Sequence, residues 1–320
     1  MVEHAVTRRS QVTEYPSRRF STGGRRFVSS ARLSGANAIV LVPLALFLGL
    51  ALLGPLFSSD PNAQNLANRL QPPAILDGQW NHPLGTDGLG RDILARTLVA
   101  ARLSLLVGAI AASISALIGV SLGLLAGSRG GWPDTFVTAT VELALSVPTI
   151  VIGIVLVSTL GQSLINLLAI LVVSGWIGYA RVVRLQARNL VRADFITGAV
   201  AIGASRARIA RVHLLPNVMP QVIVLVCQQV AAVMLWEASL TYLGIGLPIE
   251  RISLGGMIRD GQQHVFDGWW IAFMPGLAIA LAVIGFNLLA DWLQSKRDPA
   301  RSARRGGRRV RVTGATSGPS

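Results

Sequence analysis

The chain has 320 residues, of which 52% are hydrophobic and 14% are charged, and its mean hydropathy is +0.55. A soluble domain of this length cannot enclose so much apolar surface in one core, so the composition predicts an all-α, polytopic membrane protein. The formal net charge of +14 would suggest nucleic acid as a partner for a soluble protein. However, 23 of the 29 basic residues fall in segments assigned to one side of the membrane, which is the positive-inside pattern. We therefore expect cytoplasmic termini and no nucleic-acid partner.

Two basic tails flank the apolar part of the chain. Residues 1–36 are arginine-rich and lack hydrophobic periodicity, and residues 294–320 are rich in arginine, glycine and serine. We predict that both tails are disordered and cytoplasmic. The first is too long for the n-region of a cleaved signal peptide, so residues 37–57 are interpreted as a retained first transmembrane helix.

Six apolar segments are long enough, at about 20 residues per crossing, to be transmembrane helices. They lie at 37–57, 103–127, 136–160, 163–178, 218–236 and 270–293. Small residues recur in them and predict close helix packing where lipid supplies no hydrophobic drive. These residues are Gly108, Ala112, Ser115, Gly119, Gly123 and Gly127. Residues 103–293 should form a five-helix core.

Residues 58–102 are predicted to be an extracytoplasmic segment. Its first part, 58–90, is polar and contains prolines, and an amphipathic pattern over 91–102 predicts a helix lying in the membrane interface. A metal site of His82 with Asp87 and Asp92 is disfavoured, because no second histidine or cysteine is near enough to complete it.

A second extracytoplasmic segment, 239–268, is rich in glycine. It is followed by Trp269 and Trp270, which are expected to be interface anchors.

Ionisable groups are scarce inside the predicted spans, where they usually mark ion pathways. The three that occur lie near predicted span ends, where water or a helix terminus should reach them. They are Glu142, Glu237 and Asp291.

The most informative segment is a basic, glycine-containing insert at 181–216. It carries seven arginines and has no apolar run long enough to span, so it should lie in the cytosol. We predict two short helices that meet near Gly203, the second with Ser205 as its N-cap, and a surface presented to a soluble partner. A loop that merely connects two spans is the simpler alternative.

Catalytic chemistry is not evident in the sequence. The only lysine, Lys296, is preceded by Gln-Ser, so no phosphate-binding loop of the Gly-x-x-x-x-Gly-Lys type is possible. The four histidines are scattered, and the single cysteine, Cys227, excludes a disulfide framework and a multi-cysteine metal site. We predict that the chain is not an enzyme and has no cofactor of its own.

The apolar segments and the absence of a catalytic motif are compatible with two other classes of function. A stand-alone secondary transporter or channel would need inverted repeats, spans broken at mid-membrane and intramembrane ionisable groups, and Pro148 is the best candidate for such a break. A structural membrane scaffold would leave the cytoplasmic insert unexplained.

The insert resembles the signature loop of binding-protein-dependent ABC importer permeases, which runs Glu-Ala-Ala, three residues, Gly, and later Leu-Pro. Gly198 and Ala199 take the places of the two alanines, Gly203 is the glycine, and the loop closes at Pro216. Thr197 stands in place of the glutamate, so the role of that glutamate does not carry over. Three more stretches are similar to the C-type subunit of dipeptide and oligopeptide permeases. They are His82-Pro-Leu-Gly-Thr-Asp87 with Gly90-Arg91-Asp92, Glu237-Ala-Ser-Leu-Thr-Tyr-Leu-Gly-Ile-Gly246, and Pro275-Gly-Leu-Ala-Ile with Phe286-Asn-Leu-Leu and Asp291.

The resemblance implies a six-helix permease of the type I importer fold in the cell membrane. It also implies a homologous B-type permease partner, two P-loop ATPase subunits that bind ATP and magnesium, an extracytoplasmic binding protein and a peptide substrate, with nickel chelates or glutathione as alternatives. The ATPase-coupling residues that it implies are Asp194, Phe195, Thr197, Gly198, Ala199, Gly203, Ala204, His213 and Pro216. The residues lining the translocation pathway cannot be named.

Overall fold

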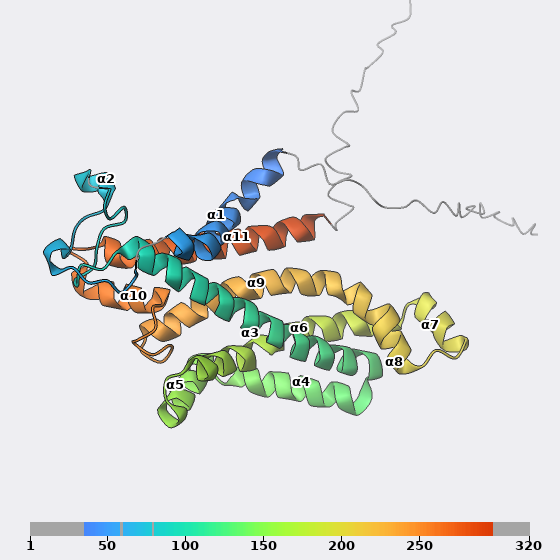
Figure 1. Cartoon of the computed structure of the whole chain (residues 1–320). Coiled ribbons are helices and arrows are strands. Elements are labelled where there is room, and N and C mark those ends of the chain that lie inside the picture. The colour runs from blue at the N-terminus through green and yellow to red at the C-terminus, as the bar shows by residue number, and fades with distance from the viewer. Residues whose placement is uncertain (1–34, 58–59, 79, 297–320) are drawn as a thin grey trace, which may run out of the picture.

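A computed structural model describes residues 35–57, 60–78 and 80–296, so the predictions for the two basic tails lie almost entirely outside the described residues (Figure 1). Within these residues the regular structure is helical, apart from one isolated bridge between Thr86 and Asp92. The helices are α1 (Gly35–Phe57), η1 (Leu66–Asn68), α2 (Ala74–Asp77), α3 (Ile93–Arg129), α4 (Gly131–Ser146), α5 (Thr149–Leu160), α6 (Leu164–Val191), α7 (Asp194–Ala201), α8 (Arg206–Arg208), the π-helical η2 (Ile209–Leu214), α9 (Leu215–Tyr242), α10 (Leu254–Gly261), η3 (Gln262–His264) and α11 (Trp270–Ser295).

Four continuous helical runs in the described residues are long and apolar enough to cross a membrane: α3, α6, α11 and the run Arg206–Tyr242 that joins α8, η2 and α9. The pair α4 and α5 passes the same test only when taken together. Helix α1 contributes a shorter apolar stretch, Leu41–Gly54. The chain is thus a multi-pass membrane protein with four or five candidate spans by these criteria, with α1 in addition.

Helix α3 is much longer than the span predicted at 103–127. Its 37 residues correspond to about 55 Å, against about 30 Å for the hydrocarbon core of a bilayer. The predicted interfacial helix at 91–102 is therefore wrong as a separate element, because it forms the first turns of α3. The Asp92 carboxylate caps α3 by accepting from the Ala95 amide at 2.9 Å, and Ile93 packs against Leu254 of α10 and Trp270 of α11 rather than against lipid.

The predicted third span, 136–160, is not one straight helix. It breaks at Val147 and Pro148 into α4 and α5, which meet at a bend of 80°. Proline has no amide hydrogen to continue the helical bonding, and it pushes the preceding residue out of the helical region. Val147 is accordingly extended, with φ −105° and ψ 120°.

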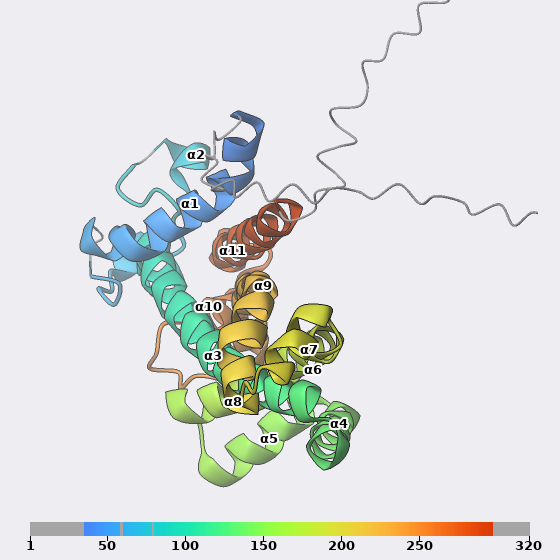
Figure 2. The same ribbon diagram turned by 90° about the vertical axis from the view of Figure 1, so that its right-hand side faces the viewer.

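Small residues bring α3 and α6 into direct contact, as their spacing predicts. Gly119, Gly123 and Gly127 lie one turn apart on α3 and face the backbone of α6. A Cβ atom on Gly123 would lie 2.8 Å from the Ala180 carbonyl oxygen and 2.9 Å from the Val183 Cβ. Helix α9 lies against both α3 and α6, and α11 lies between α9 and α1 (Figure 2).

Glu237 is not at a water-accessible span end, as the sequence had indicated. Helix α9 continues to Tyr242, and the Glu237 side chain is fully buried between helices. Its carboxyl oxygens accept hydrogen bonds from the Ser104 hydroxyl of α3 at 2.6 Å and from the Thr241 hydroxyl at 3.3 Å. Such an intramembrane polar group is costly unless it is paired, and the Ser104 bond, which crosses between the two helices, fixes how α9 sits on α3.

The glycine contact yields a first test. Gly123→Ala should destabilise the isolated chain in detergent by roughly 1–3 kcal/mol, because the added methyl group meets the backbone of α6. Gly178→Ala on α6 is the matched control, since nothing lies within 4 Å of a Cβ at that position and alanine is the better helix former. Thermal unfolding of both variants measures the difference. Equal melting temperatures would show that the glycine contact does not limit helix packing.

Candidate functional site at the two ends of the bundle

The segment between α6 and α9 protrudes at one end of the bundle (Figure 1). We call residues 192–216 the helical insert. The insert is shorter than the predicted loop at 181–216, because α6 continues without a break to Val191. Arg184 and Arg188 therefore lie on α6, where both pair with Asp134 of α4, Arg184 through two guanidinium nitrogens.

Helix α7 ends in a Schellman motif built on Gly203. The Gly203 amide donates to the Val200 carbonyl at 2.9 Å, and the Ala204 amide donates to the Ala199 carbonyl at 3.0 Å. This turn requires a left-handed residue, and Gly203 has φ +85°. No atom lies within 4 Å of a Cβ built at this position, so backbone conformation, not crowding within the chain, explains the glycine.

The second half of the insert begins at Ser205, as predicted. The Ser205 hydroxyl accepts from the Arg208 amide at 3.3 Å, and the helix then runs without interruption to Tyr242. His213 lies in the π-helical turn, which joins α8 to α9, and its carbonyl accepts from the Asn217 side chain at 2.6 Å. Pro216 directly follows the π-helical turn as the second residue of α9, and it has no amide hydrogen to donate to that turn.

A small apolar cluster holds the insert against the bundle. Ile196 of α7 packs with Ile209 and Leu214 of η2 and with Ala187 of α6, and all four are buried. These anchoring residues were not singled out from the sequence. The helical spacing of Ile196 and Ala199, both buried on α7, is the signal that could have identified the inner face.

The outer face of the insert carries most of the predicted coupling residues. Phe195 is half exposed, and its ring lies 6.3 Å from that of His213 between centroids. Of the predicted set, Ala199 is buried and Ala204 and His213 are half-buried, whereas the others are exposed. The exposed ones are Asp194, Phe195, Thr197, Gly198, Gly203 and Pro216.

Three apolar side chains on the same segment were missed from the sequence. Ile202, at the C-cap of α7, is 87% exposed, and Val200 and Val212 are each 56% exposed. Exposed β-branched residues in a polar, arginine-rich segment are not needed for its own packing. Several exposed apolar side chains on one short segment are typical of a protein-interaction site.

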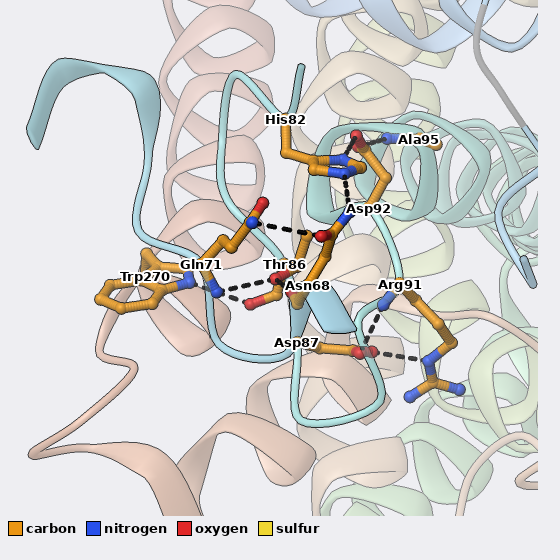
Figure 3. A network of polar contacts seen from close by, with 9 residues as sticks. All are labelled: Asn68, Gln71, His82, Thr86, Asp87, Arg91, Asp92, Ala95 and Trp270. Atoms are coloured by element: carbon orange, nitrogen blue, oxygen red, sulfur yellow. Dashed lines mark hydrogen bonds and ion pairs between the residues drawn. The ribbon is translucent and has the colours of Figure 1, made fainter. Parts of the chain in front are cut away.

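A polar network closes the opposite end of the bundle (Figure 3). The Asp87 carboxylate accepts from the backbone amides of Leu89 and Arg91 at 2.9 Å, and from the Arg91 guanidinium at 2.6 Å. The Thr86 hydroxyl donates to the Asn68 carbonyl at 2.5 Å. Asp87 thus organises a turn.

Trp270 belongs to this network and is not an interface anchor, which corrects the sequence prediction. Its indole nitrogen donates to the Thr86 carbonyl at 3.1 Å, and the residue is 6% exposed. The neighbouring Trp269 is 43% exposed. The hydrogen bond joins two segments that are 184 residues apart and secures the 60–92 segment to α11.

His82 and Asp92 form an ion pair or hydrogen bond, depending on the protonation of the imidazole. The His82 Nδ1 atom lies 2.8 Å from an Asp92 carboxylate oxygen, while the other oxygen caps α3. The described residues contain no group of three histidine, cysteine, aspartate or glutamate side chains that could hold a metal ion.

Comparison of the sequence with known proteins identifies a matching family and similar chains. Residues 119–302 match the family described as the inner membrane component of binding-protein-dependent transport systems. The chain is 35% identical over 294 residues to the dipeptide transport system permease protein DppC of Bacillus subtilis, covering 91% of this chain and 89% of the relative.

Two further relatives align over similar lengths. The oligopeptide transport system permease protein OppC of Bacillus subtilis is 34% identical over 84% of this chain and 86% of its own. The probable D,D-dipeptide transport system permease protein DdpC of Escherichia coli is 32% identical over 89% of this chain and 94% of its own. With a helical bundle, a projecting insert and this extent of similarity, the chain belongs to the family of inner membrane components of binding-protein-dependent transport systems.

Proposed function

We propose that this chain is the C-type permease subunit of an ATP-driven importer for peptides, and that it forms half of the translocation pathway. The observation that carries the proposal is the helical insert, a compact element with an exposed apolar surface at one end of a family member's bundle. The peptide substrate follows from the names of the relatives, which are dipeptide and oligopeptide permeases. Nickel chelates and glutathione are the alternative substrates.

The proposed topology has six crossings, with α1 as the first and the bent pair α4 and α5 as the third. An even number of crossings puts both termini on the side of the helical insert. The distribution of arginine supports a cytoplasmic assignment for that side, because the insert and both tails carry most of the basic residues.

The insert is suited to transmit force from a soluble ATPase subunit. Its two ends continue directly into α6 and α9, and its apolar cluster ties it to α6. Movement of α7 would therefore carry both helices with it. Because α6 is packed tightly on α3 through glycine contacts, the helices would rotate as one body, as alternating access requires.

The proposed assembly contains a homologous B-type permease and two P-loop ATPase subunits, which would bind ATP and magnesium. An extracytoplasmic binding protein would deliver the peptide to the opposite end of the bundle. The neutral, small character of Thr197 and Gly198 on the exposed face of α7 suits close contact with an ATPase surface.

Substitutions of Gly203 should separate its conformational role from steric contact with the ATPase. Gly203→Ala places a side chain at φ +85°, which costs about 1–2 kcal/mol, whereas Gly203→Asn adds a larger side chain that tolerates this conformation better. We expect the alanine variant to lose more peptide uptake and more ATPase subunit in a pull-down than the asparagine variant. Greater loss with asparagine would instead show that the ATPase approaches this residue closely.

The topology can be tested with single cysteines in a Cys227→Ser background. A cysteine at the exposed Ala207 in the insert should react with an impermeant maleimide only in inside-out vesicles, and one at the exposed Ala67 only in right-side-out vesicles. Native Cys227, which is half-buried near the middle of α9, should resist labelling in both. Labelling of both introduced cysteines from one side would exclude the proposed topology.

The purified chain alone should release phosphate from ATP only at background rate, because it has no phosphate-binding loop. Adding the two ATPase subunits should restore hydrolysis. The measurement is phosphate release before and after their addition. Hydrolysis by a preparation shown by mass spectrometry to contain only this polypeptide would contradict the assignment.

A further inference from the structure

A small cavity lies at the end of the bundle opposite the helical insert, between the start of α3, the end of α9 and α10. Its volume is about 20 Å³, enough for one water molecule or one carboxylate oxygen. Three guanidinium groups and one carboxylate line it: Arg96, Arg251, Arg259 and Asp260. The lining is therefore positively charged overall, in a part of the molecule to which the proposed function assigns no residue.

Arg96 provides the fixed part of this cavity. Its side chain is 8% exposed, yet it makes a single hydrogen bond within the described residues, to the Pro61 carbonyl at 3.3 Å. The Asp87 carboxylate lies 3.8 Å from its Nε atom and is already bonded to Arg91. A guanidinium has five N–H donors, so most of the Arg96 donors have no acceptor among the described residues.

Arg251 and Arg259 add charge at the open side of the cavity. Arg251 is exposed and Arg259 is half-buried, and neither pairs with a carboxylate of the described chain within 4.0 Å. Three arginines around one cavity with a single facing acid repel one another unless an anion joins them. The planar fork of arginine favours a carboxylate or phosphate, and the cavity volume suits a single oxygen of such a group.

We propose that this cavity binds the C-terminal carboxylate of the peptide before it enters the membrane part of the pathway. Its position at the end remote from the insert is where the proposed topology puts the incoming substrate. This inference rests on the proposed function, which supplies the peptide. The carboxylate would complete the hydrogen bonding of Arg96 and neutralise the excess charge of Arg251 and Arg259.

The cavity also touches the buried junction between α3 and α9. Thr241 lines it, and the Thr241 hydroxyl bonds both Glu237 and the Leu247 amide. Thr241 would connect a carboxylate bound here to Glu237, and the hydrogen bond from Ser104 to Glu237 joins the two helices. Binding at this end thus has a short route to the packing of α9, whose other end carries the insert.

Arginine modification provides a direct test in the complete complex in nanodiscs. Phenylglyoxal should modify Arg251 and Arg259 about tenfold more slowly when the dipeptide Ala-Ala is present at about ten times its dissociation constant, because only the unoccupied site reacts. Ala-Ala amide, which lacks the carboxylate, should not protect. Arg69 is exposed on the same end of the chain, does not line the cavity and should react at one rate throughout. Peptide mapping by mass spectrometry measures each rate.

Transport provides the second readout. The double variant Arg251→Gln with Arg259→Gln should lower the ratio of Ala-Ala uptake to Ala-Ala amide uptake about tenfold, while Arg69→Gln should leave it unchanged. Any preference of the binding protein for Ala-Ala over Ala-Ala amide is the same in all variants, so it does not affect the change in this ratio from one variant to another. Arg96 is left intact because its burial makes any substitution a folding risk.

Several outcomes would overturn the proposal. The first is an equal modification rate of Arg251 and Arg259 with and without Ala-Ala in a complex that takes up the peptide. The second is slower modification of these arginines when the ligand-free binding protein is added without peptide. The third is slower modification that depends on anionic lipid in the nanodisc instead of on peptide. A complex that takes up no peptide but is still protected by Ala-Ala would contradict the proposed function and leave the cavity as a carboxylate site.

Discussion

The close contact of α3 with α6 is the constraint on which the rest of the bundle depends. Lipid offers no hydrophobic drive for helix association, so the helices must gain from dispersion contacts that require the backbones to approach closely. Gly119, Gly123 and Gly127 permit that approach along three successive turns. Once α6 is fixed on α3, the end of α6 at Val191 has a defined position, and the helical insert that follows it has a rigid base.

Buried polar groups then select one arrangement among the packed alternatives. The Ser104 hydroxyl of α3 donates to Glu237, whereas Thr241 lies on α9 itself and moves with Glu237, so a shift of α9 along α3 by one turn would break the Ser104 bond and leave the buried carboxyl with one partner. The break at Pro148 and this buried carboxyl are features that a stand-alone transporter would also require. They occur here in a member of the importer permease family, so they do not by themselves distinguish the two classes of protein.

Length and hydropathy predict most of the helices, because a run of about 20 apolar residues forms few structures other than a transmembrane helix. The sequence also indicates the small-residue contacts and the Ser205 cap, which depend on local spacing. What it misses depends on distant partners. The pattern at 91–102 predicted an interfacial helix, because its apolar face packs against α10 and α11, which lie far away in the sequence. Glu237 and Trp270 were misjudged for the same reason, since each is buried by segments more than a hundred residues away.

The helical insert illustrates why a site on a membrane protein can be recognised before its geometry is known. The bilayer excludes a polar segment, which explains its place between spans, whereas its inner face is decided by three residues that pack against α6. Ile196, Ile209 and Leu214 share a small apolar core with Ala187 of α6, so the outer face of the insert is free to carry Ile202 and Val200 without loss of structure. A flexible loop would absorb the motion of a bound partner, because its ordering would first cost conformational entropy. A packed insert joined directly to two helices passes that motion into the membrane.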